Sequence, residues 1–369
     1  MAEPVSIFEE KHEADSGWKI AQPDYDWSFP RDHWAHHGYR TEWWYFTGCL
    51  EAVDEPDRRF GYQFTIFRNG LLLPEKPTAS SKSTSTNLLV GHAAVSDLSK
   101  KDHRFGDLSY GEHPLLSEFR DPPDEIIAWA LAPSGTDGRW LLRWNGEAFD
   151  FEMRDEARAM AFRLSTRLLK PLVLQGPNGY IRKGEGPTAA SHYYSFTRLA
   201  TDGILTLDGQ TWRVRGTSWM DKEFGSSQLS KEQVGWDWFS IQLDDGRDLM
   251  LYLQRRKDGT ADYRNGTLIA TDGTPRYMDA AEWSVQATET WTSPSTKASY
   301  PMRWTVDLPA EGFRLEVAPE FPEQENLSRI EGIPFYWEGA VRVLGPNGKS
   351  VGRGYVELTG YGENSRPAV

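Results

Sequence analysis

Two neighbouring segments decide the fold: Arg40-Thr-Glu-Trp-Trp-Tyr-Phe-Thr-Gly48 and Phe60-Gly-Tyr-Gln-Phe-Thr-Ile-Phe-Arg68. In an extended chain, side chains alternate between two faces. The second segment then places Tyr62, Phe64 and Ile66 on one face and Gln63, Thr65 and Phe67 on the other. The polar residues 55–59 between the segments predict a hairpin. Aromatic residues on both faces indicate a sheet that is packed on both sides or curls around an interior.

The composition favours an all-β protein of two domains. The chain has 369 residues with 16 Trp, 15 Tyr, 17 Phe, 33 Gly and 22 Pro. Aromatic strands, frequent turn residues and few long helical patterns are typical of β-proteins. The length exceeds that of one ordinary sandwich or barrel, so we expect two domains of ordinary size.

The net charge of the chain restricts the kinds of partner that we expect. A net charge of −13 without a basic stripe argues against nucleic acid and against an anionic membrane surface. We also expect no bilayer-spanning segment, because no apolar run is long enough.

Cys49 is the only cysteine, so an intrachain disulfide cannot form. No signal peptide is visible, which leaves the cytoplasm or the mature form of a secreted or periplasmic protein.

A second hairpin is predicted further along the chain. Its strands are Trp236–Leu243 and Asp248–Arg255, joined by a turn at Asp244–Gly246. Each half of the chain thus has an aromatic strand, a short turn and a return strand that ends in Arg. This loose similarity is consistent with an internal duplication.

Four clusters contain residues suited to chemistry. They are Glu42-Trp-Trp-Tyr45, Ser191-His-Tyr-Tyr-Ser-Phe-Thr-Arg198, Gly216-Thr-Ser-Trp-Met-Asp-Lys-Glu-Phe-Gly225 and Tyr336-Trp-Glu-Gly339. In an extended segment, Asp221 and Glu223 point to the same face with Trp219 beside them. A carboxyl group next to indoles can acquire a raised pKa, and can therefore act as a general acid.

Structural roles compete with these interpretations. Aromatic residues of a strand usually just form part of a hydrophobic core, and Trp43 and Trp44 would then have a structural role. Arg198 would pair with a buried carboxylate such as Glu42 or Asp221, which would make that carboxylate part of a structural ion pair.

We expect no metal and no organic cofactor. The segment His33-Trp-Ala-His-His37 has superficial metal-ligand spacing, but it lacks a matching carboxylate or second His group. The sequence also lacks a Gly-x-Ser-x-Gly elbow, a Walker-type loop and a dinucleotide fingerprint after a strand. A serine hydrolase or a nucleotide-dependent enzyme is therefore not expected.

The ordered set of motifs resembles the AttH-like, carotenoid 1,2-hydratase family. The resemblance extends from about Glu42 to Tyr361 and is carried by Glu42-Trp-Trp-Tyr45, Phe60-Gly-Tyr-Gln-Phe-Thr65, Tyr194-Ser-Phe-Thr-Arg-Leu199, Trp219-Met-Asp-Lys-Glu-Phe-Gly225, Gly235-Trp-Asp-Trp-Phe239, Tyr300-Pro-Met-Arg-Trp304 and Tyr336-Trp-Glu-Gly-Ala-Val341. It implies two lipocalin-like β-barrels side by side and apolar substrates such as polyenes, terpenoids or polyketides. Lys222 and Phe224 depart from the family pattern, in which a basic or His residue and a Trp are common.

Together these observations predict residues 1–224 as a first lipocalin-like domain and 225–369 as a second, in a monomer. The expected function is cofactor-free, acid-catalysed hydration of a C=C bond in a hydrophobic small molecule. The candidate acids are Asp221 first, then Glu223 and Glu42. The candidate substrate-binding residues are Trp43, Trp44, Tyr45, Tyr194, Arg198, Trp219, Trp238, Tyr336 and Trp337.

Two other functions need the same aromatic pocket. The protein would be a non-catalytic carrier if the cavity only binds an apolar ligand. It would be a cyclase, of the kind that guides a pericyclic ring closure, if the cavity only holds a flexible substrate in a reactive conformer.

Overall fold

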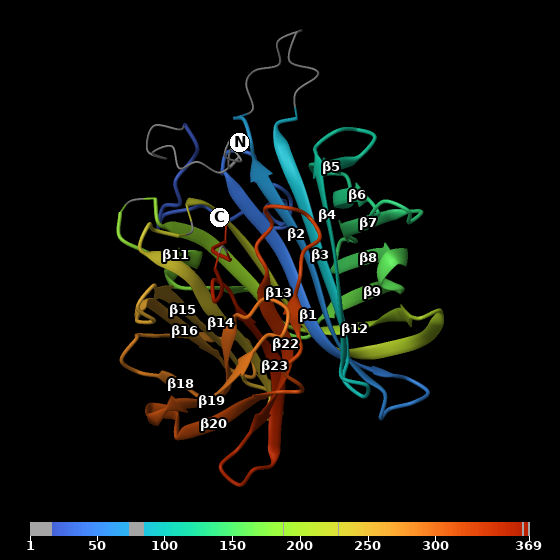
Figure 1. The fold of residues 1–369 in the computed structure, drawn as a ribbon. Coiled ribbons are helices and arrows are strands. Elements are labelled where there is room, and N and C mark those ends of the chain that lie inside the picture. The colour runs from blue at the N-terminus through green and yellow to red at the C-terminus, as the bar shows by residue number, and fades with distance from the viewer. Residues whose placement is uncertain (1–16, 74–84, 187, 228, 364, 368–369) are drawn as a thin grey trace.

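The chain forms two antiparallel sheets, as the sequence predicts. The computed structural model describes residues 17–73, 85–186, 188–227, 229–363 and 365–367. The first sheet is a nearly closed barrel and the second is a curled half-barrel (Figure 1). The described residues contain no α-helix; the short 3-10 helices are η2 Arg31–His33, η3 Glu156–Arg158, η4 Pro177–Gly179 and η5 Pro309–Glu311. The all-β prediction is therefore confirmed.

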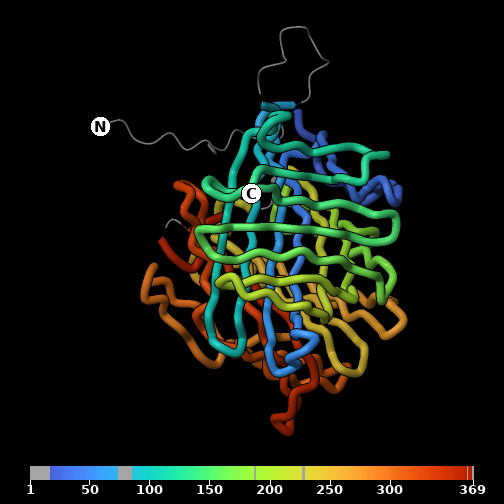
Figure 2. The backbone as a smooth tube through the Cα atoms, turned by 90° about the vertical axis from the view of Figure 1, so that its right-hand side faces the viewer, coloured from blue at the N-terminus to red at the C-terminus, as the bar shows by residue number. Residues whose placement is uncertain are grey.

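The first sheet has 13 strands in the order β4-β3-β2-β1-β13-β12-β9-β8-β7-β6-β5, with β10 and β11 paired to β12. Figure 2 shows β6 to β9 crossing one side of this barrel as successive rows. The strands are β1 Thr41–Ala52, β2 Arg59–Gly70, β3 Asn87–Asp97, β4 Asp102–Gly111, β5 Ser117–Phe119, β6 Ile126–Leu131, β7 Arg139–Trp144, β8 Phe149–Asp155, β9 Met160–Leu168, β10 Val173–Leu174, β11 Tyr180–Arg182, β12 Ala190–Leu207 and β13 Gln210–Ser227.

The second sheet has 10 strands in the order β17-β16-β15-β14-β23-β22-β20-β19-β18, with β21 paired to β22. Its first strand begins six residues after the end of β13. The strands are β14 Gln233–Leu243, β15 Asp248–Arg256, β16 Ala261–Ile269, β17 Pro275–Met278, β18 Ser284–Thr292, β19 Ser299–Leu308, β20 Phe313–Pro319, β21 Glu325–Asn326, β22 Tyr336–Leu344 and β23 Ser350–Leu358.

Both predicted hairpins are present. Strand β1 pairs with β2, and β14 pairs with β15. Gly246 in the second turn has a φ of +92°, a conformation that glycine adopts without strain. The predicted faces of β2 are confirmed as well, because Tyr62, Phe64 and Ile66 lie in the barrel core and the alternate residues point away from it. Strand alternation therefore determines what lies inside the barrel.

Three apolar clusters hold the sheets together. The first fills the barrel, where the Phe64 and Phe151 rings stack with centroids 5.1 Å apart. The second lies inside the half-barrel around Phe239, Trp304 and Trp337. The third lies between the two sheets and is made of residues on their facing sides. The third cluster shows that the outer face of the barrel is also a packing surface.

A buried carboxylate joins the two sheets by ion pairs. Asp248 at the start of β15 is fully buried and accepts hydrogen bonds from Lys170 Nζ at 2.7 Å and from Arg198 Nη2 at 2.6 Å. The Thr197 hydroxyl donates to the same carboxylate at 2.8 Å. Arg198 therefore pairs with a buried carboxylate, as expected, but that carboxylate is Asp248 and not Glu42 or Asp221. Arg198 lies where the pairing of β12 with β13 is irregular, between Phe196 and Leu199.

None of the helices among the described residues has the length and apolar character that a membrane-spanning segment requires.

Replacing Asp248 should weaken the whole fold. We expect Asp248→Asn to lower the free energy of unfolding by about 3–5 kcal/mol, because Lys170 and Arg198 would keep their charges in a buried place without a counter-charge. The matched control is Asp245→Asn, which removes an exposed partner of Arg247 and should cost about 1 kcal/mol or less. Urea unfolding measures both. Equal, small losses in the two variants would contradict the structural role of Asp248.

Candidate functional site

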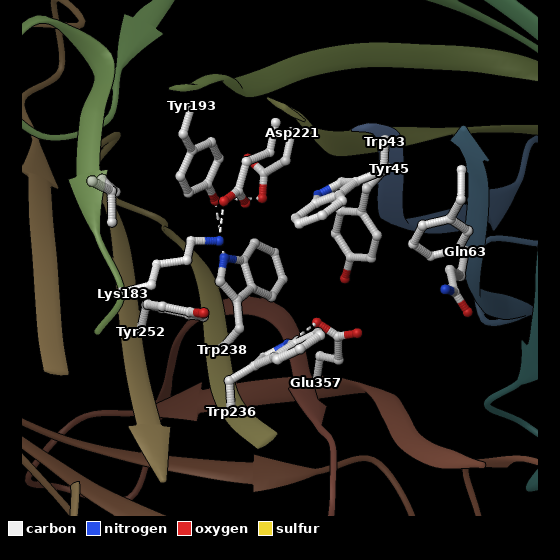
Figure 3. Close-up of a pocket in the computed structure, with 13 residues that line it drawn as sticks. Trp43, Tyr45, Gln63, Lys183, Tyr193, Asp221, Trp236, Trp238, Tyr252 and Glu357 are labelled. Atoms are coloured by element: carbon white, nitrogen blue, oxygen red, sulfur yellow. Dashed lines mark hydrogen bonds and ion pairs between the residues drawn. The ribbon is translucent and has the colours of Figure 1, made fainter. Parts of the chain in front are cut away.

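A partly open cavity lies between the barrel and the half-barrel (Figure 3). Its walls come from strands of both sheets and from the segment that follows β11. The volume of the cavity is about 50 Å³, which is enough for a few water molecules. A larger ligand would therefore need some side chains to rotate. The lining residues are Trp43, Tyr45, Gln63, Phe67, Ile181, Lys183, Tyr193, Asp221, Glu223, Trp236, Trp238, Tyr252 and Glu357.

The register of β13 positions the two carboxylates that the sequence singles out. Asp221 is opposite Tyr45 and Glu223 is opposite Trp43 on β1. The structure confirms that Asp221 and Glu223 share a face, because both line the cavity. Lys222 between them points to the other side and lies over the ring of Trp44, with Nζ 3.3 Å from the ring centroid.

Asp221 is held by three donors. Its Oδ1 accepts from Ser195 Oγ at 2.5 Å and from Trp219 Nε1 at 2.7 Å, and its Oδ2 accepts from Tyr193 Oη at 2.6 Å. The side chain is 3% exposed. Burial raises the pKa of Asp221 to about 7, although the three hydrogen bonds oppose the rise. Near neutral pH, Asp221 can therefore either hold or release a proton.

Tyr193 connects Asp221 with the cavity. Its hydroxyl donates to Asp221 and accepts from Trp238 Nε1 at 3.1 Å. Both oxygens of Asp221 are already covered by donors. A proton that leaves Asp221 for a molecule in the cavity would therefore pass through the Tyr193 hydroxyl.

Glu223 is tied to a cation. Lys183 forms an ion pair with it, and the Ser191 hydroxyl donates to it. The Lys183 ammonium lies 5.3 Å from the ring centroid of Trp43 and 5.1 Å from that of Tyr252. Burial lowers the pKa of Lys183, and the charge of Glu223 opposes that change. This ion pair places the Lys183 amino group against the aromatic wall.

Glu357 on β23 forms part of the opposite wall. Its Oε2 accepts from Trp236 Nε1 at 2.7 Å. Burial raises the pKa of Glu357 to about 7, with Asp221 and Glu223 adding to the rise. Figure 3 shows the Trp238 indole between the carboxyl groups of Asp221 and Glu357, with Trp236 beside Glu357. The site thus has two carboxyl groups that can hold protons, and they belong to different sheets.

Three sequence candidates lie on the barrel side of the same strands. Glu42, Trp44 and Tyr194 point into the barrel, not into the cavity. Glu42 is 1% exposed, accepts from Arg68 Nε at 2.8 Å and forms an ion pair with Lys222. Burial alone would raise the pKa of Glu42, but Lys222, His36 and Arg68 hold it well below its usual range. Glu42 is therefore an ionised member of a buried network that is separate from the cavity.

The remaining candidates surround the cavity at different distances. Trp219 donates a hydrogen bond to Asp221, and Trp43, Tyr45 and Trp238 line the cavity itself. Tyr336 accepts a hydrogen bond from the cavity residue Gln63 at 2.9 Å. Trp337 lies in the core of the half-barrel, and Arg198 lies against Asp248.

The His segment near the N-terminus takes part in hydrogen bonds. His36 Nδ1 bonds with Glu42, and His33 Nδ1 lies 2.7 Å from Tyr194 Oη. Within the described residues, no group of three or more His, Cys, Asp or Glu side chains is arranged to hold a metal ion.

Several cavity residues were not predicted from the sequence. Trp236 could have been found, because it is two residues from the candidate Trp238 on the same face. Phe67 shares its strand face with Gln63, which also lines the cavity. Tyr193 was passed over for Tyr194, which points into the barrel. Lys183 and Glu357 have no local signal at all, because only the packing of the two sheets brings them to the cavity. The other residues missed are Gln63, Ile181 and Tyr252.

Comparison with known proteins identifies the family. The AttH-like family model matches residues 20–361, so the chain belongs to the AttH-like family. A crystal structure from Nitrosomonas europaea, of a protein provisionally named AttH, is similar with 30% identity and a TM-score of 0.80, covering 94% of this chain and 100% of that one. Kievitone hydratase from Nectria haematococca is similar in fold, with 14% identity, a TM-score of 0.64 and coverage of 93% and 94%. No curated protein matches the sequence.

The network around Glu42 should contribute to stability and not to ligand binding. We expect Glu42→Gln to lower the free energy of unfolding by about 3–5 kcal/mol at pH 7, because Lys222 and Arg68 would lose their counter-charge. Since the pKa of Glu42 is depressed in the folded protein, this contribution should shrink as the pH falls below about 4. Denaturant unfolding at several pH values checks both points. A stable variant that loses ligand binding would contradict this assignment.

Proposed function

We propose that this protein adds water to a C=C bond of a hydrophobic small molecule, with a carboxyl group of the chain as the acid. The observation that carries the proposal is the cavity between the sheets, where Asp221 lies among indole and phenol rings. A buried carboxyl group with a pKa near the working pH is suited to general acid catalysis. The reaction needs no group beyond those that the chain provides.

Asp221 and Tyr193 would deliver the proton together. When Asp221 is protonated, it donates to the Tyr193 oxygen across the same 2.6 Å contact, so the Tyr193 hydroxyl can give its own proton to one alkene carbon and take the proton of Asp221. The Trp238 N–H bonded to the same oxygen stabilises it while charge develops there. The Trp219 N–H and the Ser195 hydroxyl stabilise the carboxylate that Asp221 becomes.

The aromatic wall suits the cation that such a protonation creates. The indoles of Trp43, Trp236 and Trp238 line the cavity. A cation near the face of an aromatic ring gains about 0.5–2 kcal/mol, most when water is excluded. The name of kievitone hydratase describes a hydratase with the same fold, which supports this class of reaction without identifying the substrate.

The direct test uses alkenes of different shapes in isotopically labelled water. Wild-type protein is incubated with an acyclic carotenoid, a prenylated phenol and a cyclic terpenoid in H₂¹⁸O, and mass spectrometry detects labelled alcohol. We expect labelled product from at least one of them. We expect Asp221→Asn to lower the turnover by about 10²–10⁴-fold while ligand binding, measured by Trp fluorescence quenching, is retained.

The surface variant Asp245→Asn serves as the activity control, because Asp245 lies outside the cavity and pairs with Arg247. An Asp221→Asn variant with full activity would remove Asp221 from the mechanism. Binding without any product would favour a carrier, and an unlabelled cyclic isomer would favour a cyclase.

The pH dependence gives a separate prediction. Because Asp221 must be protonated to act as the acid, the rate should fall as the pH rises through its pKa of about 7. The fall should be absent in Asp221→Asn, whose residual rate should be nearly flat above neutral pH. Initial rates between pH 5 and 9, with folding monitored by circular dichroism, measure the profile. A wild-type rate that stays constant across that range would contradict an acid role for Asp221.

A further inference from the structure

We propose that Glu357 is the base that takes a proton from the attacking water, so that the acid and the base of the site come from different sheets. The inference rests on the proposed hydration and adds the second catalytic residue, which had no signal in the sequence. Hydration requires two proton transfers at two places, one to the alkene carbon and one from water. A second carboxyl group on another wall of the cavity allows water to attack from a different side than the one from which the proton arrives.

The position of Glu357 fits that role. It is on β23, where it is opposite Trp238 on β14, and both residues line the cavity. The Trp236 N–H can only donate, and it holds Oε2 as an acceptor at 2.7 Å. Oε1 is therefore left for a water molecule. An indole N–H also stabilises Asp221, so each carboxyl group is oriented by its own tryptophan.

The other buried acids are less suitable. Glu223 forms an ion pair with Lys183 and accepts a hydrogen bond from Ser191, so its carboxylate is already occupied by these two partners. Glu338 is opposite Glu357 on β22, but Tyr45 donates to its Oε1 and the residue is not among those that line the cavity. Burial, with Glu357 adding to it, raises the pKa of Glu338 well above its usual range, which favours the neutral form.

The groups that face Glu357 decide how it titrates. The carboxyl groups of Asp221 and Glu223 on β13 and of Glu338 on β22 disfavour its charge, and Lys183 favours it. Tyr45, Tyr252 and Tyr336 also interact with it, and each has a pKa far above neutral, so they remain neutral. Asp221 and Glu357 therefore repel each other when both are ionised. One shared proton near pH 7 leaves one acid and one base.

The proposed step balances in atoms and electrons. The π electrons of the alkene form a new C–H bond with the proton from the Tyr193–Asp221 pair, and the adjacent carbon becomes a cation. A water oxygen forms the C–O bond with that cation, and the Glu357 carboxylate takes one water proton. The product is the alcohol, with Asp221 ionised and Glu357 protonated. Proton transfer from Glu357 to Asp221 through water restores the starting state.

The first test measures the charge coupling without a substrate. Infrared difference spectra follow the band of protonated carboxyl groups between pH 5 and 9 in wild type, Glu357→Gln, Asp221→Asn and the control Glu118→Gln. Glu118 is matched because it also accepts from an indole, Trp129 Nε1 at 2.8 Å, away from the cavity. We expect Glu357→Gln to lower the pKa of Asp221, since it removes a nearby negative charge, and Glu118→Gln to leave it unchanged. An unchanged Asp221 pKa in Glu357→Gln would overturn the proposal.

The second test measures rates with the alkene that the wild type hydrates. The base must be ionised and the acid protonated, so the wild-type rate should rise with pH through the lower and fall through the higher of the two pKa values of the Asp221–Glu357 pair. We expect Glu357→Gln to lower kcat by about 10²–10⁴-fold with little change in KM, to abolish the rising limb, and to move the falling limb to lower pH together with the Asp221 pKa. Trp236→Phe, which keeps the carboxyl group but removes its donor, should move the rising limb to higher pH.

The outcomes separate this proposal from the one on which it rests. Hydration by the wild type and at full rate by Glu357→Gln would overturn the role of Glu357 alone. Absence of labelled alcohol with the wild type would remove both proposals. If Glu357→Gln does not fold, Trp236→Phe decides, because an unshifted rising limb in that variant would exclude Glu357 as its origin.

Discussion

The site depends on the antiparallel pairing of β1 with β13. Each of these strands carries cavity residues on one face and barrel residues on the other, and the register places Tyr45 opposite Asp221 and Trp44 opposite Lys222. A slip of β13 by one residue would move Lys222 to the cavity and Asp221 into the barrel. The buried ion pairs of Glu42 with Lys222 and Arg68 oppose such a slip, because they form only in the observed register.

The burial of several carboxyl groups away from water explains the chemistry of the space between the two sheets. Asp221, Glu223, Glu338 and Glu357 lie close together with Lys183 as the cation among them. Ionising all four carboxyl groups in a poorly solvated space would be costly. The cluster reduces that cost by keeping protons on some of its members. A high affinity for protons at neutral pH therefore follows from where these acids are buried.

The sequence predicted the fold well because strand alternation and turn residues are local signals. The two aromatic hairpins, the shared face of Asp221 and Glu223 and the all-β class all depend on neighbouring residues. A buried carboxylate was correctly expected for Arg198, but not which one, since the contact with the second sheet decides it. Lys183 and Glu357 depend on long-range packing as well. In this protein, the parts of the site that come from one strand were predictable, and those assembled from two sheets were not.

The polar side chains between the sheets have a consequence for evolution. Gln63 on β2 donates to Tyr336 at 2.9 Å and accepts from Asn326 at 2.9 Å, both in the second half of the chain. Asp248, in the second half, forms ion pairs with Lys170 and Arg198 of the first half. Separating the halves would leave these groups without partners on surfaces that are now buried. If the two sheets arose by duplication, they have since lost their independence, and recombination between relatives would need to exchange both halves together.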